Sequence, residues 1–198
     1  MSLSPIRSTV NAGIAVFKKI LEVFDGGFSL TITGFNTSSD WASEITLDEG
    51  SLLLIDEEAR TATPVKTALC GATGTATTVY VASGHHFQAG DYLAYGGTGA
   101  RISTITASAT LGLDVIVTST GAFSISSAGD VFWNAAAIGA TGTALITPNA
   151  LSLYPVKIET GATVAAVRRG TAYKKRIQNH TTALVADLPA TIQLSNSY

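Results

Sequence analysis

The chain has 198 residues, of which 46% are apolar and only 13% are charged. That length and composition exclude a disordered tail and suffice for one large β domain or two small ones. The formal charge of -2 and the pI near 5.9 argue against a general nucleic-acid-binding protein. The single cysteine, Cys70, excludes an internal disulfide.

Residues with branched β-carbons are abundant in the chain. Threonine, isoleucine and valine together supply 55 residues. Such side chains lose freedom in a helix and pack well on a pleated sheet. Many short strands separated by glycine turns are typical of a sandwich or barrel. We therefore predict an all-β fold made of antiparallel sandwich or barrel modules, with an internally duplicated central β unit.

The N-terminal stretch admits two interpretations. Its apolar residues between Ile6 and Phe24 recur at helical spacing. In contrast, Asp25-Gly26-Gly27 lies between two apolar runs and is typical of a hairpin turn that needs positive φ. We favour a hairpin after Ile20, and the segment before Ile14 is either an extended arm or a short helix. The first residues lack the pattern of a signal peptide, so none is predicted.

Charge is unevenly distributed along the chain. Residues 1–66 carry 14 of the 26 charged residues and residues 157–198 carry 8, whereas the 90 residues between them carry four. This contrast predicts an inserted, charge-poor β domain at 67–156, set into an outer β domain that comprises 1–66, with an N-terminal arm, and 157–198. One continuous sandwich is the alternative. Residues 131–156 carry no charge, but their glycines and prolines indicate buried strands or a subunit contact rather than a membrane span.

The central segment contains an internal repeat. Val79-Tyr80-Val81-Ala82-Ser83 recurs 36 positions later as Val115-Ile116-Val117-Thr118-Ser119, and Phe87 recurs as Phe123 at the same offset. Each copy predicts a strand, a loop with an aromatic anchor, a tight turn and a second strand.

Glycine-centred turns separate the predicted strands. Ala89-Gly90-Asp91 returns 39 positions later as Ala128-Gly129-Asp130. Glycine permits positive φ, and aspartate accepts bonds from nearby backbone N–H groups, which favours turns over a pair of catalytic carboxylates. The residues with predicted structural roles in turns are Gly50, Gly90, Asp91, Gly129, Asp130 and Gly161.

The sequence contains no recognisable active-site pattern. It has no phosphate-binding loop, dinucleotide fingerprint or nucleophile elbow. His85 and His86 with Asp91 could meet a metal, but neighbouring residues on a strand point to opposite faces, which favours polar loop residues. Cys70 lies among small residues and is predicted to be an apolar filler. We therefore predict that the protein is not an enzyme and has no catalytic residue, metal or cofactor.

Opposite charges are concentrated in two segments, one acidic and one basic. The simplest interpretation is two solvated faces. Alternatively, the two patches meet, either within the outer domain or between subunits. The acidic balance of the whole chain disfavours a nucleic-acid strip at the basic segment. The candidate subunit-contact charges are Asp48, Glu49, Asp56, Glu57, Glu58, Arg168, Arg169, Lys174, Lys175 and Arg176.

Two segments, Phe24-Asp25-Gly26-Gly27-Phe28 and the run from Gly50 to Lys66, resemble capsid auxiliary proteins of tailed bacteriophages, of the head-decoration or head-fibre type. In that group a glycine, an apolar strand, an aspartate and a short Ala/Pro stretch lie on a small β domain that coats the capsid. The resemblance covers roughly the first third of the chain. It implies a homo-oligomer, in particular a homotrimer, that binds the major capsid protein on the exterior of the virion after synthesis in the host cytoplasm.

We therefore expect a non-enzymatic virion structural protein that binds the outer capsid surface and oligomerises to decorate or stabilise the head. Neither a membrane nor nucleic acid is an expected partner. The alternative is a glycan or host-surface binding module of a fibre or tail protein, although core packing is the simpler role for its aromatic side chains. The candidate platforms for that alternative are Tyr80, Phe87, Tyr92, Tyr95 and Trp133.

Overall fold

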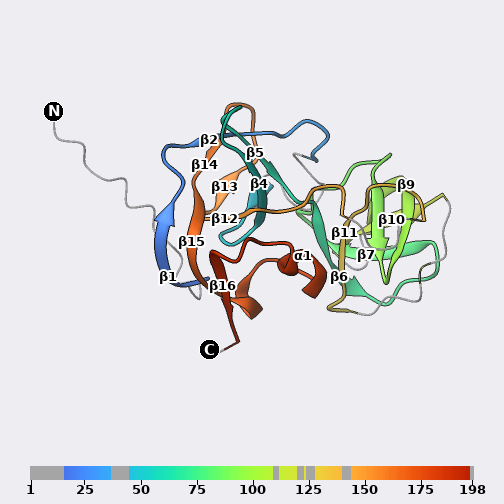
Figure 1. Ribbon diagram of the computed structural model, residues 1–198. Coiled ribbons are helices and arrows are strands. Elements are labelled where there is room, and N and C mark those ends of the chain that lie inside the picture. The colour runs from blue at the N-terminus through green and yellow to red at the C-terminus, as the bar shows by residue number, and fades with distance from the viewer. Residues whose placement is uncertain are drawn as a thin grey trace.

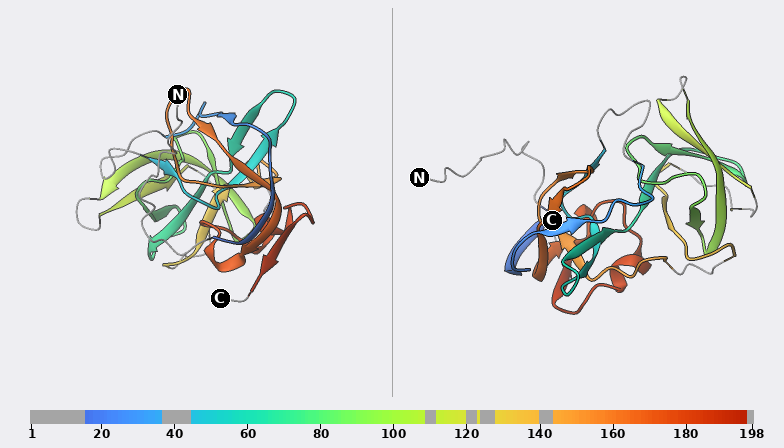
Figure 2. Two further views of the ribbon diagram at one scale, coloured as in Figure 1. Left: turned by 90° about the vertical axis from the view of Figure 1, so that its left-hand side faces the viewer. Right: turned by 90° about the horizontal axis from the view of Figure 1, so that it is seen from above.

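The computed structural model describes residues 16–36, 45–108, 112–119, 123, 128–139 and 144–196. Their regular secondary structure is almost entirely β-strand, so the all-β prediction is confirmed. A curled sheet and a closed barrel lie side by side, the sheet on the left and the barrel on the right of Figure 1, and Figure 2 separates them in the same way from above. Within the described residues, helical structure is limited to η1 (Lys174–Arg176) and α1 (Thr182–Ala186), and no helix has the length and apolarity to cross a membrane.

The curled sheet runs in the order β1-β15-β12-β4-β5-β2-β14, and β16 also pairs with β15. The pairs β2–β5 and β15–β16 are parallel, so this sheet is mixed where the sequence predicts antiparallel modules. In both pairs the chain passes through intervening elements before it returns, which a parallel connection requires. The strand bounds are β1 Phe17–Val23, β2 Phe28–Leu30, β4 Leu52–Asp56, β5 Thr61–Pro64, β12 Ala150–Ser152, β14 Thr163–Val164, β15 Ala166–Tyr173 and β16 Ile192–Ser195. Next to it, β3 (Thr46–Leu47) pairs with β13 (Val156–Lys157).

The barrel closes in the order β10-β7-β6-β11-β8-β9, and every neighbouring pair is antiparallel. A closed ring has no unpaired strand edge. Phe87 and Phe123, the predicted aromatic anchors, are both buried in its interior, where Phe123 packs edge-on against Phe132 at 5.9 Å. The strand bounds are β6 Thr67–Ala72, β7 Thr78–Ala82, β8 Tyr92–Tyr95, β9 Thr98–Ser108, β10 Leu113–Thr118 and β11 Val131–Asn134.

The internal repeat is three strands long in the structure. β8 pairs with β9 through Leu93 and Ala100, and β11 pairs with β6 in the same register through Phe132 and Ala68. The two copies of each repeated strand also pair with each other, β7 with β10 and β8 with β11. The units β6-β7-β8 and β9-β10-β11 are therefore related by an approximate two-fold axis. The correspondence of β6 with β9 lies beyond the repeat that the sequence reveals.

The two repeated turns have the same backbone geometry. Gly90 N donates to Ile102 O at 2.9 Å, and Ile102 N donates at 2.8 Å to the carbonyl of the aspartate that follows Gly90. Cys70 makes the same two bonds with Gly129 and its following aspartate, at 2.9 and 2.7 Å. The φ angles of Gly90 and Gly129 are +98° and +97°. Both turns therefore need glycine for the reason that the sequence predicts.

A shared apolar core joins the curled sheet to the barrel. Trp133 and Ala94 of the barrel belong to the same buried cluster as Leu52 and Leu151 of the sheet. Leu184 of α1 is part of this cluster, so the short helix packs against it rather than lying on the surface. The sheet and the barrel therefore share buried apolar surface, which favours a fixed relative position over independent motion.

The predicted hairpin after Ile20 is wrong. β1 and β2 flank Asp25-Gly26-Gly27, but β1 pairs with β15, and β2 pairs with β5 and β14. Gly26 adopts positive φ, and Arg60 Nη2 donates to the carbonyls of Asp25 and Gly27 at 2.8 and 3.2 Å. The bend therefore sends the chain to another part of the sheet instead of folding β2 back on β1. The segment before Ile14, predicted as an arm or helix, lies outside the described residues.

Because the two repeated turns have the same geometry, we expect the same substitution to destabilise both. Nothing lies within 4 Å of a Cβ built at Gly90 or Gly129, so Gly90→Ala and Gly129→Ala each change backbone strain alone. We expect each to lower the free energy of unfolding by about 1–2 kcal/mol, and by similar amounts. Gly27→Ala, at a glycine without positive φ, is the control and should cost less than about 0.5 kcal/mol. Denaturant titration measures all three, and two unchanged midpoints would contradict the assignment.

Candidate functional site

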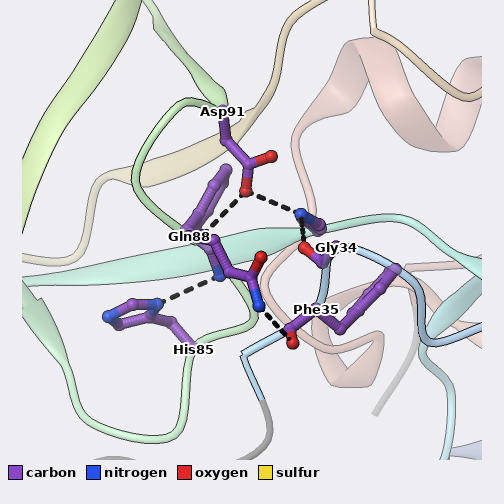
Figure 3. A network of polar contacts seen from close by, with 7 residues as sticks. Gly34, Phe35, His85, Gln88 and Asp91 are labelled. Atoms are coloured by element: carbon purple, nitrogen blue, oxygen red, sulfur yellow. Dashed lines mark hydrogen bonds and ion pairs between the residues drawn. The ribbon is translucent and has the colours of Figure 1, made fainter.

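A buried ion pair lies where the chain passes from the sheet to the barrel. Lys66 stands between β5 and β6, and its side chain is only 6% exposed. Its ammonium donates to Gly34 O and to Asp91 Oδ2, the latter at 2.6 Å, and lies 4.9 Å from the centre of the Phe35 ring (Figure 3). Asp91 Oδ2 also accepts the Gln88 N–H at 2.8 Å. The ion pair between Lys66 and Asp91 thus attaches the repeated turn of the first copy to the sheet.

Backbone and amide bonds reinforce this contact, which we call the joint: residues 31–36 of the sheet, Lys66, and residues 83–91 of the barrel. Gln88 Nε2 donates to Phe35 O at 2.6 Å, as Figure 3 shows. Asn36 N donates to His86 O at 3.1 Å. Both bonds cross from one unit to the other, so the joint has a defined geometry.

His85 lies on the barrel side of the joint and is buried. Its Nδ1 accepts the Phe87 N–H at 3.2 Å, which places the proton of the neutral ring on Nε2. Nε2 lies 3.3 Å from Asp114 Oδ2 of β10. Burial, with a smaller contribution from His86, lowers the pKa of His85 to about 4, so the ring is neutral at pH 7.

His86 lies on the sheet side of the joint. Its Nε2 is 3.4 Å from Thr46 O, and its ring centre is 5.8 Å from that of Phe35. Burial lowers the pKa of His86 to about 4; the Thr46 carbonyl opposes this shift and the charge of Lys66 adds to it. The predicted role of both histidines as loop residues is correct, although they are buried in the loop rather than solvated.

A cavity of about 110 Å³ adjoins the joint. It has room for several water molecules. Partial withdrawal of Asp48 from water at its wall raises the pKa of that carboxyl, and the bond from Thr46 Oγ1 opposes the shift. Asn179 on another wall has φ of +37°, an uncommon conformation for a residue with a side chain. The polar lining includes Thr46, Asp48, Ser51, Ser83, His86 and Asn179.

The metal alternative finds no support at the histidines. Within the residues that the structure describes, no group of three His, Cys, Asp or Glu side chains is arranged to hold a metal ion. Asp91, the third candidate ligand, faces Lys66 instead. Cys70 is buried in the barrel, where its Sγ donates to Ala72 O at 3.1 Å, as expected for a small core residue.

The remaining predicted turn residues have separate structural contacts. Gly50 has φ of +78°, and a Cβ there would come within 2.6 Å of Val16. Gly161 has φ of +82°. Asp130 Oδ2 accepts the Tyr95 hydroxyl at 2.7 Å within the barrel. Asp130 and Asp91 thus occupy equivalent turns but have different partners.

The structure brings together only part of the predicted charge clusters. Arg168 lies 3.6 Å from Glu57 and 3.7 Å from Glu22, so one acid and one base of the two segments meet within the chain. Glu49 Oε1 accepts the Val16 N–H at 3.2 Å. Asp56 Oδ1 accepts two backbone N–H groups in the turn that also contains exposed Glu58.

The rest of the basic segment lies on β15 and η1. Arg169 is exposed on β15, in register with Glu22 of β1. Lys174, Lys175 and Arg176 form η1, where the Arg176 guanidinium lies 4.4 Å from the Tyr173 ring.

The aromatic candidates for glycan binding are mainly packing residues. Phe87 is fully buried and Trp133 is buried in the shared core. Tyr80, Tyr92 and Tyr95 are half-buried, and Tyr95 packs on the Phe132 ring at 5.1 Å. The core-packing interpretation therefore fits these side chains better than a surface platform.

β1 presents the most conspicuous apolar surface among the described residues. It lies at one end of the curled sheet, with β15 as its strand partner, and no other strand among the described residues pairs with its outer edge. Ile20, Leu21 and Val23 are exposed, Leu21 to 53%. Irregular register with β15 and the charges of Lys18 and Lys19 blunt this edge against the addition of another strand. The surface therefore suits side-chain contact with another protein more than sheet extension.

Sequence reasoning missed Lys66, the central residue of the joint. One signal was available: Lys66 is the last charged residue before the charge-poor segment, and Asp91 is the next one along the chain. Two opposite charges that flank a run of uncharged residues are candidates for pairing, because an unpaired charge is costly to bury.

Comparisons with protein-family models, with curated proteins and with solved structures yield no match for this chain. The functional proposal therefore rests on the fold and on the exposed edge of β1.

The two equivalent aspartates provide a matched test of the joint. Asp91→Asn leaves the buried Lys66 ammonium without a countercharge, and we expect a loss of about 3 kcal/mol in the free energy of unfolding. Asp130→Asn changes an uncharged hydroxyl contact in the equivalent turn of the second copy and should cost about 1 kcal/mol. Urea titrations of both variants measure the difference. Equal losses would show that the ion pair is not what holds the joint.

Proposed function

We propose that this chain is a non-enzymatic structural protein of a virus particle, which binds the outer surface of a capsid and self-associates there. The observation that carries the proposal is the exposed aliphatic edge on β1, formed by Ile20, Leu21 and Val23. Large apolar side chains exposed along an edge strand are typical of protein contact surfaces.

The segments that resemble capsid auxiliary proteins meet in one compact unit, which supports treating them as a single module. Arg60, from the second segment, bonds to two carbonyls of the first, and its guanidinium lies 4.4 Å from the Phe28 ring. Phe24 packs edge-on against Phe28 at 5.7 Å. This unit includes β2, β4 and β5, in the same sheet as β1. A module that coats a capsid would thus have its docking edge on the same scaffold.

The architecture suits a passive coat component. Closure of the barrel protects its strand edges, and the charged and shared apolar contacts of the joint fix it to the sheet. A rigid body loses little conformational entropy when it is immobilised on a shell. The barrel then projects from the sheet as a second unit.

The double variant I20K/L21K tests the proposed contact at the exposed edge of β1. We expect the wild type to sediment as an oligomer of its 20.4 kDa chain and to co-sediment with capsids. Two lysine charges in an apolar contact should weaken capsid binding or self-association at least tenfold, a change of about 1.4 kcal/mol. Sedimentation velocity and pelleting with capsids measure these effects.

The control for this experiment is Leu145→Lys. Leu145 is 54% exposed, close to the exposure of Leu21, but it follows the bridge between Ala135 and Ala144, outside β1. It should leave both assays unchanged. A wild-type monomer that ignores capsids would overturn the proposed function, and equal losses for both variants would overturn the assignment of the contact to β1.

A further inference from the structure

A neutral imidazole sits in the contact between the sheet and the barrel. His86 belongs to the loop after β7, yet its neighbours belong to the sheet side: the Thr46 carbonyl at 3.4 Å and the Phe35 ring at 5.8 Å. Its own carbonyl accepts the Asn36 N–H. His86 therefore takes part in three of the contacts that hold the joint closed.

The charges around His86 disfavour protonation of its ring, which would place a second positive charge near Lys66. Lys66 belongs to the same joint, with its ammonium 4.9 Å from the ring that His86 also approaches. His85 is the adjacent residue, and Asp114 faces His85 at 3.3 Å. The carboxylate of Asp91 is engaged by Lys66. Asp48 lies on the wall of the adjoining cavity. The Thr46 carbonyl is the acceptor within hydrogen-bond range of His86 Nε2.

We propose that His86 is an acid-operated latch: its neutral ring closes the contact between the sheet and the barrel, and its protonation opens that contact. A positive ring beside Lys66 repels the ammonium and must leave its buried site to regain water. The adjoining cavity provides room for water next to the ring. Opening separates residues 31–36 from residues 84–91 and leaves the barrel strands paired.

The direction of the pH effect follows from the two states of the ring. In the open joint the ring is solvated and its pKa is near the ordinary 6.5, whereas in the closed joint the pKa is about 4. The open joint therefore binds more protons between these values, so closure is complete above pH 6.5 and weakens as the pH falls toward 4. Each pH unit in that window shifts the ratio of open to closed molecules by up to tenfold.

Hydrogen exchange of the full chain tests the latch. After correction for the intrinsic pH dependence of exchange, we expect protection of residues 31–36 and 84–91 to fall at least tenfold between pH 7 and pH 4.5, while β9 and β10 keep theirs. His86→Gln, which retains a donor for Thr46 O but does not titrate there, should change less than twofold, because His85 faces Asp114 within the barrel and stays there when the joint opens. His180→Gln, outside the joint, should behave as the wild type.

Three results would overturn the proposal: a joint that stays protected at pH 4.5, a His86→Gln variant that loses protection as the wild type does, or simultaneous loss of protection in the barrel. If His86→Gln fails to fold, nuclear magnetic resonance of the wild-type imidazole nitrogens decides the question. The latch requires that His86 becomes protonated over the same pH range as the joint opens. Protonation at another pH would exclude it.

Discussion

A lysine ammonium withdrawn from water fixes how the barrel sits on the sheet. Lys66 lies in the short connection between β5 and β6, so it marks the passage from one unit to the other. The cost of burying its charge is offset only where Asp91 of the barrel and the Gly34 carbonyl of the sheet reach it together. Apolar packing in the shared core attracts the two units without direction. The ion pair adds the direction, because other orientations would leave a buried cation without its partners.

The barrel also shows how a duplicated unit diverges. Asp91 and Asp130 end equivalent turns with equivalent backbone bonds, yet one binds Lys66 at the joint and the other accepts a hydroxyl within the barrel. His85 and His86 occur only in the first copy, since Gly121 and Ala122 stand at the matching positions of the second. The residues that build the joint were therefore confined to one copy, while the backbone scaffold was kept in both.

Local chemistry made the strand class and the glycine turns predictable, because branched side chains and positive φ act within a few residues. The correspondence of β6 with β9 was not predictable, since Ala68 and Ala100 are matched by their pairing register rather than by a repeated sequence. The hairpin prediction failed for a related reason: Asp25-Gly26-Gly27 indicates a bend but not which strands pair across it. The burial of Lys66 and of the two histidines depends on packing between distant segments, which no local pattern records.

In the proposed coat component, two surfaces of the molecule have different roles. The joint holds the barrel in place, and we propose that the outer edge of β1 contacts another polypeptide. Cross-linking of lysines followed by mass spectrometry, on capsids assembled with the chain, tests this division most directly. Lys18 and Lys19 lie on β1, and Lys174 and Lys175 on η1 provide an internal comparison. The account predicts links from Lys18 or Lys19 to the capsid protein or to a second copy; links only from η1, or none to any other polypeptide, would contradict it.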